Sequence, residues 1–504
     1  MKKILTILTA ALTLASCGSF DEINQNPDAS TNVTPSFLAT NAILNVTART
    51  GRKWFVSDAW IVKQLTHTEF MEDYLYNKFE KSNFDDYELL TSTLKMVEIA
   101  EADEMMPEEK KNSYRALNLF VQSYVFYNKT MEMGDIPCSE ALKGESESLI
   151  EPKYDTQEQV FETIINNLSK ASDLFAHAVN FEGDPILSGK SDLWEKTTNA
   201  FLLRVLNMVS KKAKVGTIDV KSKFEQVAAL PLYANEDESL QRVYSADKSS
   251  QWYPFYWEIN NDYAYPYFSS FFVDMMKSLN DKRLFLYAEP APVLKDKGED
   301  TFDAYSGVDV VKSYGTVQSE CMSGMHSPIN KRYHRNPQGE PTKVISYSEI
   351  QFILAEAALR GWKTPMSAKQ HYENGVSAAM LFAQANTPEQ YCHNVVIDES
   401  TISEYLDGAA KFDESKGLEQ VITQKFIASF LQYPYNSYFD YRRTGLPKLP
   451  ISEATNLNEK KDRMPVRWMY PTSEYSLNKT NIQEAVQRQF GGTDTPNGVM
   501  WILK

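Results

Sequence analysis

Apolar residues recur three and four positions apart through much of this chain, which is the spacing of one face of an α-helix. Residues 114–125, 155–168 and 193–212 each carry such an apolar stripe, and Asp155–Glu158 has the polar pattern of a helix start. A helix with one apolar face is stable when that face packs against another element. The sequence therefore predicts an all-α fold.

The clearest predicted helix runs from Ser346 to Arg360. Ser346 and Glu349 have the spacing of a capping box, an apolar face follows, and Gly361 supplies the stop. Small alanine side chains on this helix allow a second helix to approach closely, and that partner is predicted to begin near Tyr372. Such helix pairs are typical of α-solenoid-like scaffolds, although no strict repeat period is visible.

Residues 216–345 do not follow the helical pattern. Proline and glycine are dense throughout this segment, and both interrupt helices. We therefore predict a large irregular insertion on one face of the helical scaffold. Long ordered loops of this kind commonly carry function.

The insertion contains an unusual concentration of aromatic residues. Residues 252–272 hold eleven aromatics, whereas aromatic residues make up 12% of the whole chain. Sugar rings have apolar C–H faces that stack on aromatic rings, and Tyr and Trp suit such half-wet sites. More than half of these aromatics, above all Phe271 and Phe272, are expected to pack in the core. The predicted ligand-binding residues of this run are Trp252, Tyr253, Trp257, Asn260, Asn261, Asp262, Tyr263 and Tyr265.

The N-terminus predicts export and a membrane anchor. Two lysines precede an apolar run, residues 4–14, that is too short to cross a bilayer. Leu14-Ala15-Ser16-Cys17 follows and resembles a bacterial lipobox, in which the cysteine receives a diacylglycerol and becomes the new N-terminus. We predict a signal peptide over residues 1–16, a lipid on Cys17 and a tether over residues 17–35. The alternative is an ordinary signal peptide with a chance cysteine.

Composition and motifs exclude several classes of function. The net charge of −15 argues against a nucleic-acid partner. No nucleophile elbow, P-loop, dinucleotide fingerprint or HExxH motif is present, so the sequence predicts no enzyme. A helical scaffold that binds only protein is a further alternative, which the aromatic insertion disfavours. The remaining cysteines give no disulfide framework or zinc pattern, and whether one bridge forms is left open. They are Cys138, Cys321 and Cys392.

Six segments match the signatures of one known family in the same order along the chain. They are Phe20–Pro27, Gly134–Ala141, Pro152–Glu158, Tyr347–Ala357, Asp440–Gly445 and Arg463–Pro471. One such match is weak evidence, but six in order span nearly the whole chain. In these segments the chain resembles the SusD-like (RagB/SusD) family of outer-membrane nutrient-binding lipoproteins, with Cys138 in place of the usual aromatic residue.

This resemblance implies a TPR-like scaffold of helix pairs, forming a single domain over residues 36–504. It implies that the protein captures glycans or other oligomeric nutrients and delivers them to a SusC-like TonB-dependent outer-membrane transporter, without catalysis. Asp21 and Glu22 resemble a signal for export to the cell surface, so we expect an outward-facing lipoprotein of the outer membrane. Peptide uptake by the same architecture and, less favoured, a surface glycan hydrolase are the alternatives.

The resemblance also indicates a second candidate segment, Glu69–Asn77, whose counterpart in several relatives contributes to the binding face. Its predicted ligand-binding residues are Asp73, Tyr74 and Tyr76. The alternative for this segment is a solvated helix end. The signature arginines are expected to cap helix ends or pair with carboxylates rather than bind ligand. They are Arg442, Arg443 and Arg467. No cofactor or metal is predicted; structural calcium is left open, since no EF-hand-type loop is present.

Overall fold

The computed structural model describes residues 33–49, 55–69, 72–433 and 435–504. The predicted signal peptide, Cys17, Asp21, Glu22 and most of the predicted tether lie outside the described residues. Within the described ranges, no helix is long and apolar enough to cross a membrane.

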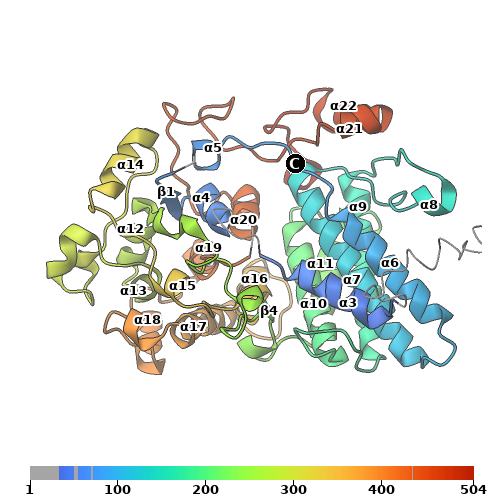
Figure 1. Cartoon of the computed structure of the whole chain (residues 1–504), viewed down its shortest axis with the longest axis horizontal. Helices are drawn as coiled ribbons and strands as arrows, with labels where there is room; N and C mark the ends of the chain where they lie inside the picture. Colours follow the sequence, from blue (N-terminus) through green and yellow to red (C-terminus); the bar gives the residue numbers. More distant parts are fainter. Residues whose placement is uncertain (1–32, 50–54, 70–71, 434) are drawn as a thin grey trace, which may run out of the picture.

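A group of long helices forms one side of the molecule, at the right of Figure 1. They are α3 (Pro35–Val46), α6 (Tyr87–Ala102), α7 (Glu108–Met133), α9 (Gln157–Ala176) and α10 (Ser191–Met208). Each packs against the next along the chain. The predicted stripe of residues 114–125 lies on α7 and is largely buried. Thr156 caps α9 in a reciprocal capping box with Gln159, which confirms the predicted helix start.

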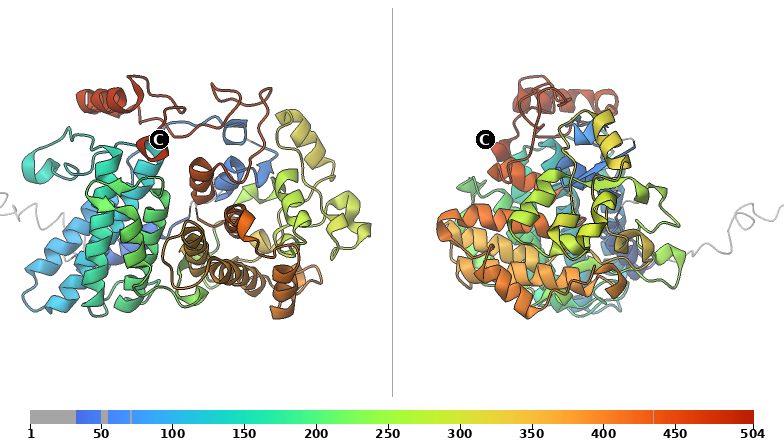
Figure 2. Two further views of the ribbon diagram at one scale, coloured as in Figure 1. Left: turned by 180° about the vertical axis from the view of Figure 1, so that it is seen from behind. Right: turned by 90° about the vertical axis from the view of Figure 1, so that its left-hand side faces the viewer.

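A second group of helices continues the same packing after a long interruption in sequence. It comprises α16 (Tyr347–Leu359), α17 (Ala368–Ala385), α19 (Gly417–Ala428) and α20 (Asn436–Thr444). Helix α10 contacts α16, and α16 contacts both α17 and α19. Figure 2 shows the two groups side by side from behind. This arrangement confirms the predicted all-α, TPR-like scaffold of helix pairs.

The prediction placed small alanine side chains of the first helix at the contact between α16 and α17, whereas the structure has a glycine of α17 there. A Cβ added to Gly375 of α17 would lie 2.8 Å from the ring of Phe352 on α16. The two backbones therefore approach closely at this glycine. Gly361 has a φ of +73° just after α16, as expected of a helix stop. The predicted capping box is only half formed: Ser346 accepts from the Glu349 amide, but the Glu349 carboxylate pairs with Arg204 instead.

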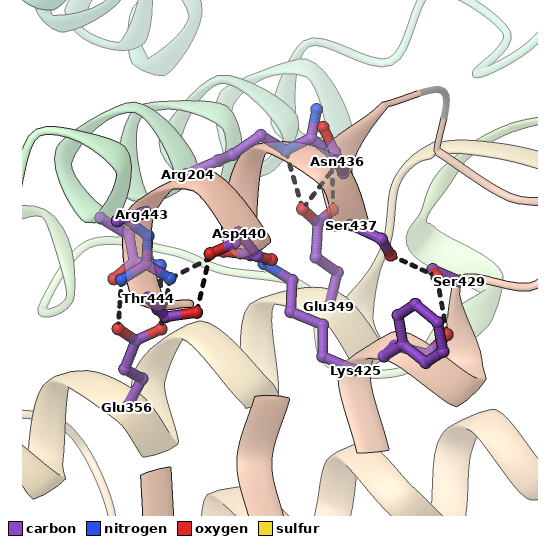
Figure 3. Close-up of polar contacts among 12 residues, drawn as sticks. Arg204, Glu349, Glu356, Lys425, Ser429, Asn436, Ser437, Asp440, Arg443 and Thr444 are labelled. Carbon is purple, nitrogen blue, oxygen red and sulfur yellow. Dashed lines mark hydrogen bonds and ion pairs between the residues drawn. The ribbon is translucent and has the colours of Figure 1, made fainter. Parts of the chain in front are cut away.

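A buried network of charges joins four helices of the scaffold (Figure 3). Arg443 of α20 donates to both carboxylate oxygens of Glu356 on α16 and, over 2.7 Å, to Asp440. Lys425 of α19 lies 2.8 Å from the other oxygen of Asp440. The Arg204–Glu349 pair links α10 to α16. Every one of these side chains is at least about nine-tenths buried, so the network stabilises helix packing.

The other signature arginines also make structural contacts. Arg467 is buried, pairs with Asp494 and donates to the Met133 carbonyl. Arg442 donates to the Val466 carbonyl over 2.8 Å and lies over the ring of Phe439. Together with the Arg443 pairs, these contacts confirm the predicted structural role.

Residues 216–345 contain short elements. The helices are α11 (Val220–Val227), α12 (Ser270–Ser278), α13 (Arg283–Tyr287), α14 (Tyr314–Met322) and α15 (Arg332–Arg335). Short 3₁₀ helices lie between them: η2 (Glu236–Glu238), η3 (Ser249–Gln251), η4 (Asn261–Ala264), η5 (Pro292–Lys297) and η6 (Phe302–Ala304). Helices α12–α15 lie at the left of Figure 1, beside the second helix group.

The described strands pair into three antiparallel two-stranded sheets. They pair β1 (Leu65–His67) with β5 (Pro266–Phe268), β2 (Lys214–Val215) with β3 (Ile218–Asp219), and β4 (Leu240–Arg242) with β6 (Thr342–Ile345). The remaining elements are α4 (Ser57–Ile61), α5 (Glu72–Leu75), α8 (Gly144–Glu147), α18 (Glu399–Asp407), α21 (Glu474–Leu477), α22 (Lys479–Phe490), η7 (Glu389–Tyr391), η8 (Glu414–Lys416) and η9 (Trp501–Leu503).

Candidate functional site

The β1–β5 pair joins the two candidate segments that are far apart in sequence. His67 pairs with Pro266, and the Thr68 amide donates to the Tyr265 carbonyl over 3.1 Å. The end of β1 thereby brings Glu69 beside Tyr265, where the Glu69 carboxylate raises the pKa of the Tyr265 hydroxyl. The start of segment 69–77 and the Tyr265 part of the aromatic run therefore meet at one place.

Much of the aromatic run forms the core. Phe272 is fully buried, as predicted, and the partly buried Phe271 packs on Phe426. Tyr253 is also fully buried, with its ring 5.0 Å from that of Phe55. Asn260 is buried as well: its oxygen accepts from the Asp262 amide, and its amide group donates to a backbone carbonyl. Burial gives Tyr253 and Asn260 a supporting position, away from any ligand at the surface.

Part of the run forms an aromatic cluster around one arginine, and this cluster reaches the surface at Trp257 although Tyr256 is buried. The guanidinium carbon of Arg335 lies 5.2 Å from the ring centroid of Trp257 and 5.1 Å from that of Tyr263. Trp257 is 39% exposed. Trp252 packs edge-on against Tyr256, whose ring neighbours Trp257. We call this set the Trp257 cluster; it comprises Trp252, Tyr256, Trp257, Tyr263 and Arg335.

Backbone contacts hold the cluster in place. The Trp257 amide donates to the His334 carbonyl over 3.0 Å, and the Tyr253 amide donates to the Pro337 carbonyl over 2.7 Å. The imidazole of His334 stacks on Tyr263 with ring centroids 4.8 Å apart. These contacts fix one face of Tyr263 and leave the outer rim of the cluster at the surface.

The charge of the cluster comes chiefly from Arg335. Burial, aided by the Arg335 charge, lowers the pKa of His334 to about 4, so this imidazole is neutral near pH 7. Among the described residues, no carboxylate forms an ion pair with Arg335. Glu258 instead accepts a hydrogen bond from the Tyr256 hydroxyl over 3.0 Å. The cluster thus offers aromatic faces and guanidinium donors to a ligand.

Arg335 and His334 were not predicted as site residues. They lie on the short helix α15, which carries no motif, and only the packing of this helix against residues 252–263 brings them to the aromatic rings. Asn261 is exposed and Asp262 half-buried on η4, the 3₁₀ turn that leads into Tyr263.

The second candidate segment is mostly packed into the protein. Tyr76 is buried and donates to the Lys312 carbonyl over 2.7 Å. Tyr74 is half-buried and packs edge-on against Phe79. Asp73 is paired with Lys78 at 2.9 Å. Of the three residues predicted here, Tyr76 is buried and supports the fold, whereas Asp73 and Tyr74 are partly exposed.

Neither metal nor disulfide chemistry is indicated in the part of the chain that the structure describes. No group of three or more His, Cys, Asp or Glu side chains there could hold a metal ion. The three cysteines are buried and unbonded, and burial raises the pKa of the Cys138 and Cys321 thiols to about 12. They are therefore protonated and unreactive near pH 7.

A TPR-like helical scaffold with an exposed aromatic cluster on an irregular insertion defines the class: a helical scaffold protein built for binding. The model of the SusD-like family described as starch-binding and associating with the outer membrane matches residues 27–471. The chain belongs to this SusD-like family.

Solved structures agree with this assignment. A SusD homologue from Bacteroides fragilis is 39% identical, with a TM-score of 0.89 over 94% of this chain and 100% of that chain. A second B. fragilis homologue is 30% identical, with a TM-score of 0.82 and the same coverage. A chitin-binding SusD homologue from Flavobacterium johnsoniae shares the fold, with 19% identity, a TM-score of 0.70 and coverage of 93% and 98%. No protein with a curated description is significantly similar.

Proposed function

We propose that this protein is a surface lipoprotein that captures glycans and delivers them to a SusC-like TonB-dependent transporter in the outer membrane. The observation that carries the proposal is the Trp257 cluster, where aromatic rings and the exposed guanidinium of Arg335 lie together at the surface. Aromatic faces bind the C–H faces of sugars, and guanidinium donors bind their oxygens. The family, whose description names starch, and the chitin-binding relative support a carbohydrate ligand.

The proposed location and partner rest on the sequence and the family. The lipobox-like Leu14–Cys17 supports a lipid anchor, and Asp21 and Glu22 support export to the cell surface. A protein tethered beside a transporter holds its ligand at a high local concentration, which favours transfer over escape. The absence of any enzyme motif in the sequence supports binding without catalysis.

Replacing Trp257 by alanine tests the binding proposal. A glycan array identifies the ligand, and calorimetry then measures its affinity for the wild type and for Trp257→Ala. Loss of one stacked ring should weaken binding about tenfold while the melting temperature stays within a few degrees. Phe37→Ala is the matched control, since Phe37 is a 67% exposed aromatic outside the Trp257 cluster. Equal affinities in all three proteins would contradict the assigned site.

The alternatives give different outcomes in the same assays. Release of shorter oligosaccharides from a bound glycan would indicate a hydrolase. Capture of casein peptides, with an array that shows no glycan bound, would indicate the peptide-uptake alternative of the same architecture.

A further inference from the structure

A groove on the face of α17 lies outside the predicted site. It consists of a hollow of about 550 Å³ between α17, η2 and β4, and of an adjoining hollow of about 310 Å³. Pro341, Ala385 and Asn386 line both hollows, so the two lie next to each other. Each lies within or near the size range of small-molecule sites.

The lining of this groove is rich in carboxamides. Six Asn and Gln side chains converge on it from four separate segments of the chain: Asn235, Gln241, Asn336, Gln338, Asn374 and Asn386. A carboxamide both donates and accepts hydrogen bonds, as a sugar hydroxyl does. Tyr347 and the 44% exposed Leu381 add apolar surface beside them. This combination matches a ligand with hydroxyl groups and apolar C–H faces.

Gln241 provides independent evidence for a ligand. The residue lines the larger hollow, and its side-chain oxygen is buried and accepts no hydrogen bond from the described residues. A buried acceptor without a donor is unfavourable, and such atoms are rare in folded proteins. A half-turn of the Gln241 carboxamide would present this oxygen to a hydroxyl group bound in the hollow, which would supply the missing donor.

The charges around the groove favour an uncharged ligand. The buried ammonium of Lys343 is paired with Glu236, and it lies 3.4 Å from the ring centroid of Phe382. The remaining charge on the lining is the carboxylate of Asp237 at the rim. An acidic glycan would find no free cation here and would be repelled by Asp237.

We propose that this groove is a second carbohydrate-binding site, specific for neutral oligosaccharides. The inference rests on the proposed glycan-binding function but uses different residues. The groove begins close to the Trp257 cluster, because Asn336 directly follows Arg335 and Tyr244 packs on Tyr253 at 5.2 Å. A long glycan chain bound at the cluster could therefore continue into the groove.

The test compares variants of the full-length protein in detergent by calorimetry. The probes are maltohexaose, chitohexaose and cellohexaose, with tetragalacturonic acid as the acidic probe. Gln241→Met removes the unpartnered oxygen at nearly constant volume, and Ala378→Trp fills the larger hollow. Each variant should weaken the binding of the best neutral hexasaccharide at least about fivefold. For Gln241→Met this corresponds to the loss of one hydrogen bond, and the melting temperature of this variant should not fall. Lys369→Ala, on the exposed face of the same helix, should leave affinity unchanged.

The outcomes separate this inference from the proposed function. If Gln241→Met and Ala378→Trp bind with wild-type affinity while Trp257→Ala loses binding, the groove is not a binding site and the proposed function still holds. A preference for tetragalacturonic acid that Gln241→Met abolishes would overturn the neutral specificity. No binding by the wild type to any probe or to a glycan array would overturn both proposals.

Discussion

Arg443 shows how single residues of the family signatures act. Its guanidinium bridges Glu356 and Asp440 in the interior, and Arg360 also pairs with Glu356. Burial alone would raise the pKa of Glu356, but Arg443 and Arg360 lower it to about 2. The signature is therefore explained by the need to neutralise charge between helices.

Replacing Arg443 by methionine should destabilise the protein strongly. Glu356 and Asp440 would each lose a buried partner, although Arg360 and Lys425 still neutralise part of their charge. We expect a loss of about 3 kcal/mol in the free energy of unfolding, measured by denaturant titration. Arg463→Met removes an exposed pair with Asp462 and should cost under about 1 kcal/mol. Similar costs for the two variants would contradict the assigned importance of the buried network.

His393 gives the stability a pH dependence near neutrality. Burial would lower its pKa, but the Glu289 carboxylate 3.6 Å away and a hydrogen bond to the Phe285 carbonyl outweigh burial and raise it. The stabilisation is therefore complete below the unfolded-state value of 6.5 and is lost as the pH rises through the higher folded-state value. Thermal unfolding from pH 6 to pH 8.5 should show falling stability in the wild type and a flatter profile in His393→Asn. Asparagine tolerates the φ of +50° at this position. Parallel profiles would disprove the assignment.

At the scale of elements, the packing of α16 on α17 depends on one glycine. Gly375→Val should improve helix propensity by a few tenths of a kcal/mol, but its side chain would collide with the ring of Phe352. The collision is the larger effect, so we expect a net loss of about 1–3 kcal/mol in unfolding free energy. Lys369→Val on the exposed face of α17 should change it by less than about 0.5 kcal/mol. An unchanged Gly375→Val protein would show that the two helices can separate at no cost.

The same elements show what the sequence could predict. Helix α16 was recognisable because its apolar period, its N-cap serine and Gly361 are local signals. The pairing of β1 with β5 joins strands of three residues from distant segments, and no local pattern specifies such a register. The same limit applies to Arg335, because its role depends on the packing of the short helix α15 against the aromatic run. Composition located the aromatic run, but only packing separates the buried Tyr253 from the exposed Trp257.

At the scale of the whole molecule, the predicted lipid on Cys17 and the folded body have separable roles. The binding residues proposed above all lie on the body, so the body should bind ligand without the lipid. The lipid would keep the body beside its transporter, where the effective concentration is far above that of a free protein. Acyl chains anchor by burying CH₂ groups in the bilayer, and losing them should release the protein from the membrane.

Cys17→Ala should therefore separate binding from uptake. We expect the variant to be recovered in the soluble fraction with wild-type affinity for the glycan by calorimetry, because no proposed site residue is altered. Uptake of the same glycan by cells should fall at least about tenfold, since dilution removes the advantage of tethering. Ser19→Ala, two residues into the tether, is the matched control and should remain membrane-bound with normal uptake. Normal uptake by a soluble Cys17→Ala protein would show that delivery does not need the anchor.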